Sequence, residues 1–260
     1  MTQTMTQTIL LQISFFVFGL AIGSFLNVVI FRFPALKSVI TDHSRCPHCK
    51  KKIAAFDLIP VISYVVLLGR CRNCGKKISA QYPLVELATG LLFWLLFRHF
   101  GLSYILIPYL IIVGFSILVF VYDLKYLEIP EIFSWSLLIF AVIAALLSKD
   151  FTISNFLLGG LAGGGILGIL VGISNERWMG SGDIKIGLAF GFLFGLYGAL
   201  FFLFLAFIIG AIFGLILIGL KKKRSDSVIA FSPFLIISAI ITIFFGQYLI
   251  NLYLNLLGLV

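Results

Sequence analysis

Long uncharged runs of apolar residues alternate with short polar segments along this chain. The run from Ile9 to Phe31 has 23 residues without a charge, and a helix of that length crosses a hydrocarbon core of about 30 Å. The pattern predicts an all-α polytopic membrane protein with about eight transmembrane helices. The predicted spans are residues 9–31, 83–98, 104–122, 131–148, 153–173, 184–197, 199–220 and 230–250.

Glycines divide and pattern the second half of the chain. The apolar stretch 184–220 is too long for one span, and Gly195, Tyr197 and Gly198 provide a break near its middle. Other glycines recur every four residues, a spacing that lets helices approach closely in lipid. We interpret these as packing residues: Gly160, Gly164, Gly168 and Gly172, then Gly187, Gly191 and Gly195, then Gly210 and Gly214.

The composition excludes a soluble globular fold and a disordered chain. Of the 260 residues, 61% are apolar and 11% are charged, and the mean hydropathy is +1.16. An average soluble domain has about 45–50% apolar and about 25% charged residues. Disorder requires the opposite balance, with low hydrophobicity and high charge. Lipid is therefore the main solvent of this chain.

The basic residues predict the topology. There are 19 Lys and Arg against 10 Asp and Glu. With the N-terminus outside and eight alternating spans, 17 basic residues fall inside and only Arg98 and Lys149 fall outside, which agrees with the positive-inside rule. The basic residues cluster in loops and form no continuous basic face, so we expect no nucleic-acid partner. The first basic residue is Arg32, so the sequence lacks the charged start of a cleavable signal peptide, and we expect the first span to be retained.

The spans and loops predict three parts. Residues 1–31 form the first transmembrane helix, residues 32–82 a cytoplasmic loop domain, and residues 83–260 a bundle of about seven helices. The loop domain is too small for a hydrophobic core of its own, so we expect a covalent or metal staple.

All four cysteines lie in the loop domain, as two C-x-x-C pairs. Cys46 and Cys49 are separated by 21 residues from Cys71 and Cys74, and two such pairs can supply four thiolates to a tetrahedral Zn²⁺. Disulfides and a redox-active pair are the alternatives, of which the cytoplasm disfavours disulfides. Four thiolates leave no open coordination position, so we expect structural rather than catalytic zinc.

Two aspartates at the ends of predicted spans are candidate catalytic residues. Asp123 closes the third span and Asp183 opens the sixth, and the topology places both on the cytoplasmic side. Two adjacent carboxyl groups hold one proton between them. One can then take a proton from water while the other protonates or polarises a scissile carbonyl. The alternative is that both are interfacial residues paired with Lys125 and Lys185.

Several further segments accompany these residues. They are Gly23-Ser-Phe-Leu-Asn27-Val-Val-Ile-Phe-Arg32-Phe-Pro34, Asp57-Leu-Ile-Pro60, Ile78-Ser-Ala-Gln-Tyr82-Pro-Leu-Val-Glu86 and Gly180-Ser-Gly-Asp183-Ile-Lys185. Together with the C-x-x-C pairs and the segment around Asp123, and in this order over most of the chain, they resemble the type IV prepilin leader peptidases. These bacterial enzymes, also called prepilin peptidase/N-methyltransferases, are GxGD-type intramembrane aspartyl proteases.

The resemblance implies an endopeptidase of the bacterial cytoplasmic (inner) membrane. It implies cleavage of prepilin or pseudopilin leaders after Gly on the cytoplasmic side, in pilus assembly or type II secretion. N-methylation of the new N-terminus by S-adenosyl-L-methionine would follow. The implied catalytic pair is Asp123 and Asp183, and the implied zinc ligands are Cys46, Cys49, Cys71 and Cys74. The methyl donor is expected at the loop domain, with four candidate residues by position: Asp57, Gly69, Arg70 and Glu86.

Two segments depart from the family pattern. Asp-Asn-Ile-Pro reads Asp57-Leu58-Ile59-Pro60 here, which loses an amide in the loop associated with methylation, and Ile-Pro-Asp reads Ile129-Pro130-Glu131, which keeps the acid. Asn27 and Arg32 also have structural interpretations. Asn27 can bond a neighbouring helix, and Arg32 can extend to the membrane interface.

Two other functions stay open. A small polytopic ion or solute transporter would use the aspartates as proton or cation sites and the cysteine loop to bind a metal, although the sequence shows no inverted repeat. An assembly factor would keep the protease-like scaffold without its reaction. Leader cleavage of a co-expressed prepilin separates these functions from a peptidase.

Overall fold

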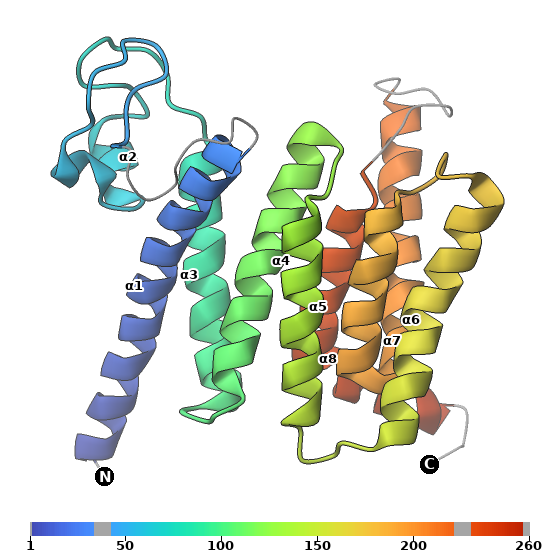
Figure 1. Cartoon of the computed structure of the whole chain (residues 1–260). Helices are drawn as coiled ribbons and strands as arrows, with labels where there is room; N and C mark the ends of the chain where they lie inside the picture. Colours follow the sequence, from blue (N-terminus) through green and yellow to red (C-terminus); the bar gives the residue numbers. More distant parts are fainter. Residues whose placement is uncertain (1, 34–42, 221–229, 257–260) are drawn as a thin grey trace. The chain divides into compact units, whose positions relative to one another are not determined.

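The computed structural model describes residues 2–33, 43–220 and 230–256, and this part of the chain is helical (Figure 1). The chain consists of two compact units, Met1–Leu106 and Ile107–Val260, and each is described by itself. Pro34, from one segment of the resemblance, lies outside the described residues. So do Lys221, Lys222, Lys223 and Arg224, which are four of the 17 basic residues that the topology places inside. The elements are α1 (Thr2–Arg32), η2 (Ala55–Leu58), α2 (Ile62–Val66), α3 (Gln81–Phe100), α4 (Leu106–Tyr126), α5 (Glu131–Leu146), α6 (Ile153–Ser174), α7 (Ser181–Gly219) and α8 (Ser232–Leu256).

The predicted all-α membrane fold is confirmed, while the count of full-length spans differs. Six helices of the described residues are long and apolar enough to cross a membrane, namely α1, α3, α4, α6, α7 and α8. The predicted fourth span is α5, an apolar helix of only 16 residues. The predicted sixth and seventh spans are the two halves of α7. The three-part domain division stays a prediction, although the contacts group α3 with α1 in the first unit.

α7 reverses direction at Gly195, the predicted break. Gly195 has φ 69° and ψ −174°, a conformation that is essentially restricted to glycine. The rings of Phe190 and Phe202 lie 5.5 Å apart, whereas twelve residues of straight helix would separate them by about 18 Å. Figure 1 shows the chain turning back at this point. Asn155 of α6 holds the turn, because its Oδ1 accepts a hydrogen bond of 2.8 Å from the Leu196 N–H.

α7 is the centre of the second unit, where it contacts α5, α6 and α8. Its contact with α6 depends on glycines, since a Cβ at Gly163 would lie 2.2 Å from the Gly187 carbonyl oxygen, and one at Gly159 would lie 2.3 Å from that of Gly191. The predicted four-residue stripe on α6 holds only in part. Cβ atoms at Gly168 and Gly172 would meet no described atom within 4 Å. Steps of four residues drift by about 40° each on a helix of 3.6 residues per turn, so the end of the stripe leaves the contact face.

In the first unit, α1 and α3 lie side by side (Figure 1). A Cβ at Gly19 would lie 2.7 Å from the Gly90 Cα, and one at Gly23 would lie 2.7 Å from the Glu86 Cα. Asn27 joins the same two helices: its Nδ2 donates to the Tyr82 carbonyl at 3.1 Å. The structural interpretation of Asn27 is therefore confirmed. The cysteine loop connects the end of α1 to the start of α3.

Candidate active site

Asp123 and Asp183 lie near each other at one end of the second unit. Asp123 lies in the last turn of α4 and Asp183 in the first turn of α7, and the two residues are only 6% and 3% exposed. Their carboxyl groups are close enough for the charge of Asp123 to act on Asp183. The structure therefore brings together the two acids that the sequence singled out.

The glycines before Asp183 fix the start of its helix. Gly180 has the extended conformation of a residue that precedes a helix, and its carbonyl accepts a hydrogen bond of 3.1 Å from the Asp183 N–H. A Cβ at Gly182 would lie 3.0 Å from the side chain of Ile129, so a larger residue would push α7 away from the start of α5. Asp183 Oδ1 is buried and has no hydrogen-bond partner among the described residues. Because buried polar atoms are normally paired, this oxygen is available to a water or a substrate.

Ser232 is a residue of this site that the sequence analysis missed. It begins α8, is fully buried, and its hydroxyl donates a hydrogen bond of 2.5 Å to Asp123 Oδ2. The two carboxyl groups therefore differ in their surroundings, since Asp123 has a hydroxyl donor and Asp183 has an unpartnered oxygen. No periodicity or motif distinguishes this serine in the sequence.

Lys185 joins the start of α7 to the start of α5. Its Nζ forms an ion pair with Glu131 Oε2, which also accepts a hydrogen bond of 3.0 Å from Trp135 Nε1. The same Nζ lies 5.3 Å from the centre of the Trp135 ring. Lys185 thus pairs with Glu131 and not with Asp183, which removes half of the interfacial alternative. Its effect is to hold the two helix starts together beside the aspartates.

The four cysteines of the first unit form one cluster. Their Sγ atoms all lie within 4.8 Å of one another, and Cys46 and Cys74 Sγ are 3.9 Å apart. Tetrahedral Zn²⁺ with Zn–S bonds of about 2.3 Å requires sulfurs about 3.8 Å apart, so the donor set fits zinc. The cysteines form no disulfide in this described loop. The backbone N–H of Cys49 helps to lower the pKa of Cys46 to about 7, whereas desolvation and the three neighbouring thiols raise the pKa of Cys74 to about 11.

The two C-x-x-C pairs have the same backbone design. Each pair lies in a turn closed by a backbone hydrogen bond: the Lys50 N–H donates to the Cys46 carbonyl, and the Gly75 N–H donates to the Cys71 carbonyl. The fourth residue after the first cysteine has positive φ in both, 59° at Lys50 and 67° at Gly75. Isolated β-bridges then flank each turn, Arg45 with Lys52 and Arg70 with Lys77. This repeat directs all four sulfurs to one point.

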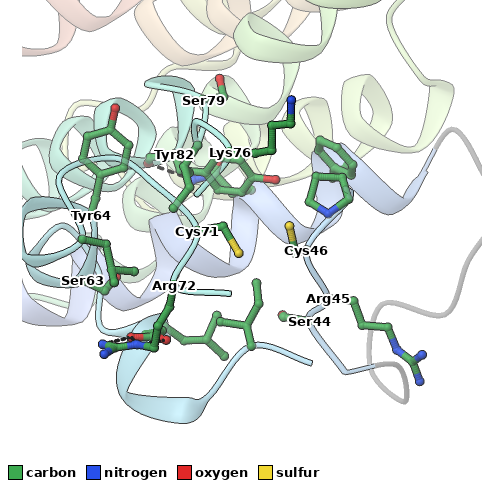
Figure 2. Close-up of a pocket in the computed structure, with 18 of the residues that line it drawn as sticks. Ser44, Arg45, Cys46, Ser63, Tyr64, Cys71, Arg72, Lys76, Ser79 and Tyr82 are labelled. Atoms are coloured by element: carbon green, nitrogen blue, oxygen red, sulfur yellow. Dashed lines mark hydrogen bonds and ion pairs between the residues drawn. The ribbon is translucent and has the colours of Figure 1, made fainter. Parts of the chain in front are cut away.

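A cavity of about 390 Å³ lies beside the cysteine cluster, within the first unit (Figure 2). Helices α1 and α3 contribute Asn27, Tyr82 and Glu86 to its lining. Helix α1 also contributes Ser24, Val28, Phe31 and Arg32. The loop contributes residues that include Ser44, Arg45, Cys46, Ser63, Tyr64, Cys71, Arg72, Lys76 and Ser79, which are labelled in Figure 2. The wall therefore combines aromatic faces with both signs of charge.

Only two of the four candidate residues for binding the methyl donor line this cavity. Asp57 and Glu86 line it, whereas Gly69 and Arg70 are not among its lining residues. Arg72 donates hydrogen bonds to both Asp57 oxygens, at 2.7 to 3.2 Å, and these bonds hold the pKa of Asp57 below its usual value. Figure 2 shows this ion pair at the Arg72 side chain.

Glu86 and Gly69 have clear structural roles. Glu86 Oε2 accepts a hydrogen bond of 2.8 Å from the Val61 N–H. Gly69 has φ +66°, and a Cβ there would lie 3.0 Å from the Tyr64 ring. A side chain at Gly69 would therefore displace Tyr64, which does line the cavity.

Comparison with known proteins agrees with these two sites. Residues 17–100 match the bacterial peptidase A24 N-terminal domain and residues 110–215 match the type IV leader peptidase family. The first range holds the cysteines and the cavity lining, and the second holds both aspartates, while Ser232 lies outside both. No solved structure matches the chain.

Similar full-length proteins carry the name prepilin leader peptidase/N-methyltransferase. The protein of Bacillus subtilis (strain 168) is 32% identical over 93% of this chain and 97% of its own length. That of Legionella pneumophila is 31% identical over 92% of each chain. That of Neisseria gonorrhoeae is 31% identical over 85% of this chain and 86% of its own. On these matches, this chain belongs to the type IV prepilin leader peptidase/N-methyltransferase family.

Proposed function

We propose that this chain is a membrane aspartyl endopeptidase with Asp123 and Asp183 as its catalytic pair. The carrying observation is that two buried carboxyl groups from different helices interact at one end of the second unit. The names of the relatives support leader peptides of prepilins as the substrates, and the resemblance described above adds pseudopilins and cleavage after Gly. The positive-inside distribution supports the cytoplasmic side of the bacterial inner membrane as the place of cleavage.

The pair hydrolyses the peptide bond by acid–base catalysis. One ionised carboxylate takes a proton from water as the water oxygen bonds to the scissile carbonyl carbon, and the other, protonated carboxyl donates to the carbonyl oxygen. When the tetrahedral intermediate collapses, the C–N bond breaks, and the leaving amine takes the proton that the first carboxyl accepted from water. The products are the free leader and a mature pilin with a new N-terminal amine.

The hydrogen bond from Ser232 supports different roles for the two aspartates. A hydroxyl that donates to a carboxylate stabilises its ionised form, so Asp123 is the base that activates water. Asp183 is the more buried residue and has no donor at Oδ1, so Asp183 carries the shared proton and polarises the carbonyl. The family membership favours this reaction over the transporter alternative.

Amide variants test the pair directly. Asp123→Asn and Asp183→Asn keep the shape of each side chain and remove the shared proton, so each variant abolishes processing of a co-expressed prepilin. Asp150→Asn, in the exposed turn between α5 and α6, is the matched control and processes normally. Normal processing by either catalytic-site variant that inserts in the membrane overturns the proposal.

The same chain is proposed to methylate the new N-terminus at the cavity beside the cysteine cluster. S-adenosyl-L-methionine would supply an electrophilic methyl group on a sulfonium. The cavity fits such a molecule, because about 390 Å³ falls within the usual range of roughly 300–1,000 Å³ for ligand sites. Tyr64 and Tyr82 would offer aromatic faces to the adenine and the sulfonium, and Lys76 would bind the carboxylate.

Direct binding tests this second site. Calorimetric titration of the purified protein with S-adenosyl-L-methionine should give a binding signal that Tyr64→Ala weakens at least tenfold. Tyr104→Ala, an exposed tyrosine before α4, should bind as the parent does. Unchanged binding by the Tyr64→Ala variant would remove the cavity as the donor site without touching the peptidase proposal.

A further inference from the structure

The segment between the two cysteine pairs exposes many apolar side chains. Residues 58–69 carry no charge, and soluble surfaces rarely expose a large contiguous apolar patch without a partner. The side chains concerned, with their exposed fractions, are Phe56 (60%), Leu58 (43%), Ile59 (45%), Ile62 (60%), Val65 (62%), Val66 (68%) and Leu68 (84%).

Part of this surface is one face of a helix. Ile62, Val65 and Val66 lie at positions i, i+3 and i+4 of α2, so they share one side of it. The inward residues Ser63 and Tyr64 line the cavity instead. α2 therefore separates the cavity from an apolar exterior.

A hydrogen bond sets the depth at which α2 begins. The Val61 N–H binds the Glu86 carboxylate, and Glu86 lies five residues inside α3, which is about 7.5 Å along the helix axis from its start. α3 is a candidate membrane span. Figure 1 shows α2 beside the adjoining ends of α1 and α3. The start of α2 thus lies level with the first turns of a membrane helix.

The backbone at this point is strained, which indicates that the position of α2 is specified. Val61 has φ 62° and ψ −50°, and the Ile62 N–H closes a tight turn onto the Pro60 carbonyl at 2.6 Å. A β-branched residue with positive φ is a true outlier, and such strain persists where the surroundings hold it in place. Here the buried Glu86 carboxylate is the group that holds it.

The neighbouring turns of α3 already face lipid. Leu84, Leu87 and Leu91 are 63%, 42% and 50% exposed, as expected on the outer face of a spanning helix. The apolar residues of α2 have exposed fractions in the same range and begin at the same level. Contact with lipid therefore accounts for the exposed apolar side chains of both α2 and α3.

We propose that residues 55–68 form an interfacial segment whose Ile62, Val65 and Val66 side chains insert between the lipids of the bilayer. Basic residues flank the segment on both sides, at Lys50–Lys52 and at Lys76 and Lys77, where they suit anionic headgroups. If the cavity holds the methyl donor as proposed above, this contact keeps the donor at the membrane surface where a pilin N-terminus is released.

Lipid quenching of tryptophan fluorescence tests the proposal. The full chain is reconstituted in vesicles whose phospholipids carry bromine on the acyl chains near the headgroup. Val66→Trp is compared with Asn73→Trp, an exposed position in the second cysteine turn, and the three native tryptophans contribute the same background to both. The expected result is that bromolipid quenches at least half of the emission added by Val66→Trp and almost none of that added by Asn73→Trp.

A second substitution guards against a misfolded variant. Val65→Trp, on the same face of α2, should be quenched as strongly as Val66→Trp. The proposal is overturned if both added signals equal that of Asn73→Trp, because protein would then cover the face. It is also overturned if an added prepilin segment relieves the quenching, because the face would then be a substrate-docking surface. Neither result depends on peptidase or methyltransferase activity.

Discussion

Removing the Ser232 hydroxyl tests the assignment of acid and base in the aspartate pair. Ser232 is fully buried and donates at 2.5 Å to Asp123 Oδ2. A hydrogen bond to a charged group contributes about 1.5–3 kcal/mol, and one pH unit corresponds to about 1.4 kcal/mol. Without the hydroxyl, ionised Asp123 is less favourable, so a higher pH is needed to form the active enzyme. Ser232→Ala should therefore move the acidic limb of the pH profile up by about one to two units.

The assay is the pH dependence of kcat/KM for cleavage of a prepilin peptide by the reconstituted enzyme, because kcat/KM reports the ionisations of the free enzyme. Ser232→Thr keeps a hydroxyl and should retain the parent profile. Ser238→Ala is the matched control, since Ser238 lies on the same helix, is equally buried and donates at 2.5 Å to the Phe202 carbonyl. It should lower stability without moving the profile.

Two results would refute the reasoning. An unchanged acidic limb in a folded Ser232→Ala enzyme would show that the hydroxyl does not support an ionised carboxylate. A shift of the basic limb instead would mean that Asp123 carries the proton, which exchanges the two roles. The control variant separates both from a general loss of packing.

Three further outcomes are expected. Gly195→Ala places a Cβ 2.2 Å from Asn155 Nδ2 in a backbone conformation restricted to glycine. Thermal unfolding should therefore show that the variant is less stable by about 2 kcal/mol or more. In the control variant Gly214→Ala, on the same helix, the added Cβ meets no described atom within 4 Å, so its stability should equal that of the parent. Cys71→Ser should lower the zinc content of the protein and should reduce methylation of the pilin more than its cleavage. Mass spectrometry of the mature pilin measures both reactions. Equal loss of methylation and cleavage would contradict a metal site that stabilises only the first unit. Lys185→Met should lower kcat with KM little changed, and its effect should not add to that of Glu131→Gln in a double-mutant cycle; strict additivity would show that their ion pair does not position α7.

Local sequence patterns predicted the elements because their causes are local. A run of apolar residues becomes a helix in lipid whatever lies elsewhere in the chain, and the break at Gly195 follows from the length of one apolar stretch. The four-residue glycine stripe was less informative. Its spacing identifies a helix face, but only the partner decides which glycines are used, so Gly159 and Gly163 make the closest backbone contacts and Gly172 meets none of the described atoms.

The residues of the candidate site also differ in how far the sequence alone identifies them. Asp123 and Asp183 stand out in the sequence because charges near membrane depth are rare. Ser232 does not stand out, because a serine in an apolar helix is ordinary, and its role depends on a partner 109 residues away. The bond between Glu86 and Val61 is similar, since nothing in either segment indicates that a membrane helix anchors the loop. These contacts are set by tertiary packing and become visible only in three dimensions.

The two proposed reactions depend on different units of the chain. The aspartates, Ser232 and the Lys185–Glu131 pair all lie in Ile107–Val260, whereas the cysteine cluster and the cavity lie in Met1–Leu106. Each unit makes the contacts that hold its own site. In Ile107–Val260 these are the glycine contacts between α6 and α7 and the hydrogen bond from the Leu196 N–H to Asn155. In Met1–Leu106 they are the contact between α1 and α3 and the hydrogen bond from the Val61 N–H to Glu86. Cleavage must come first, because only cleavage creates the amine to be methylated. A variant that harms only the second unit should therefore leave methyl-donor binding intact.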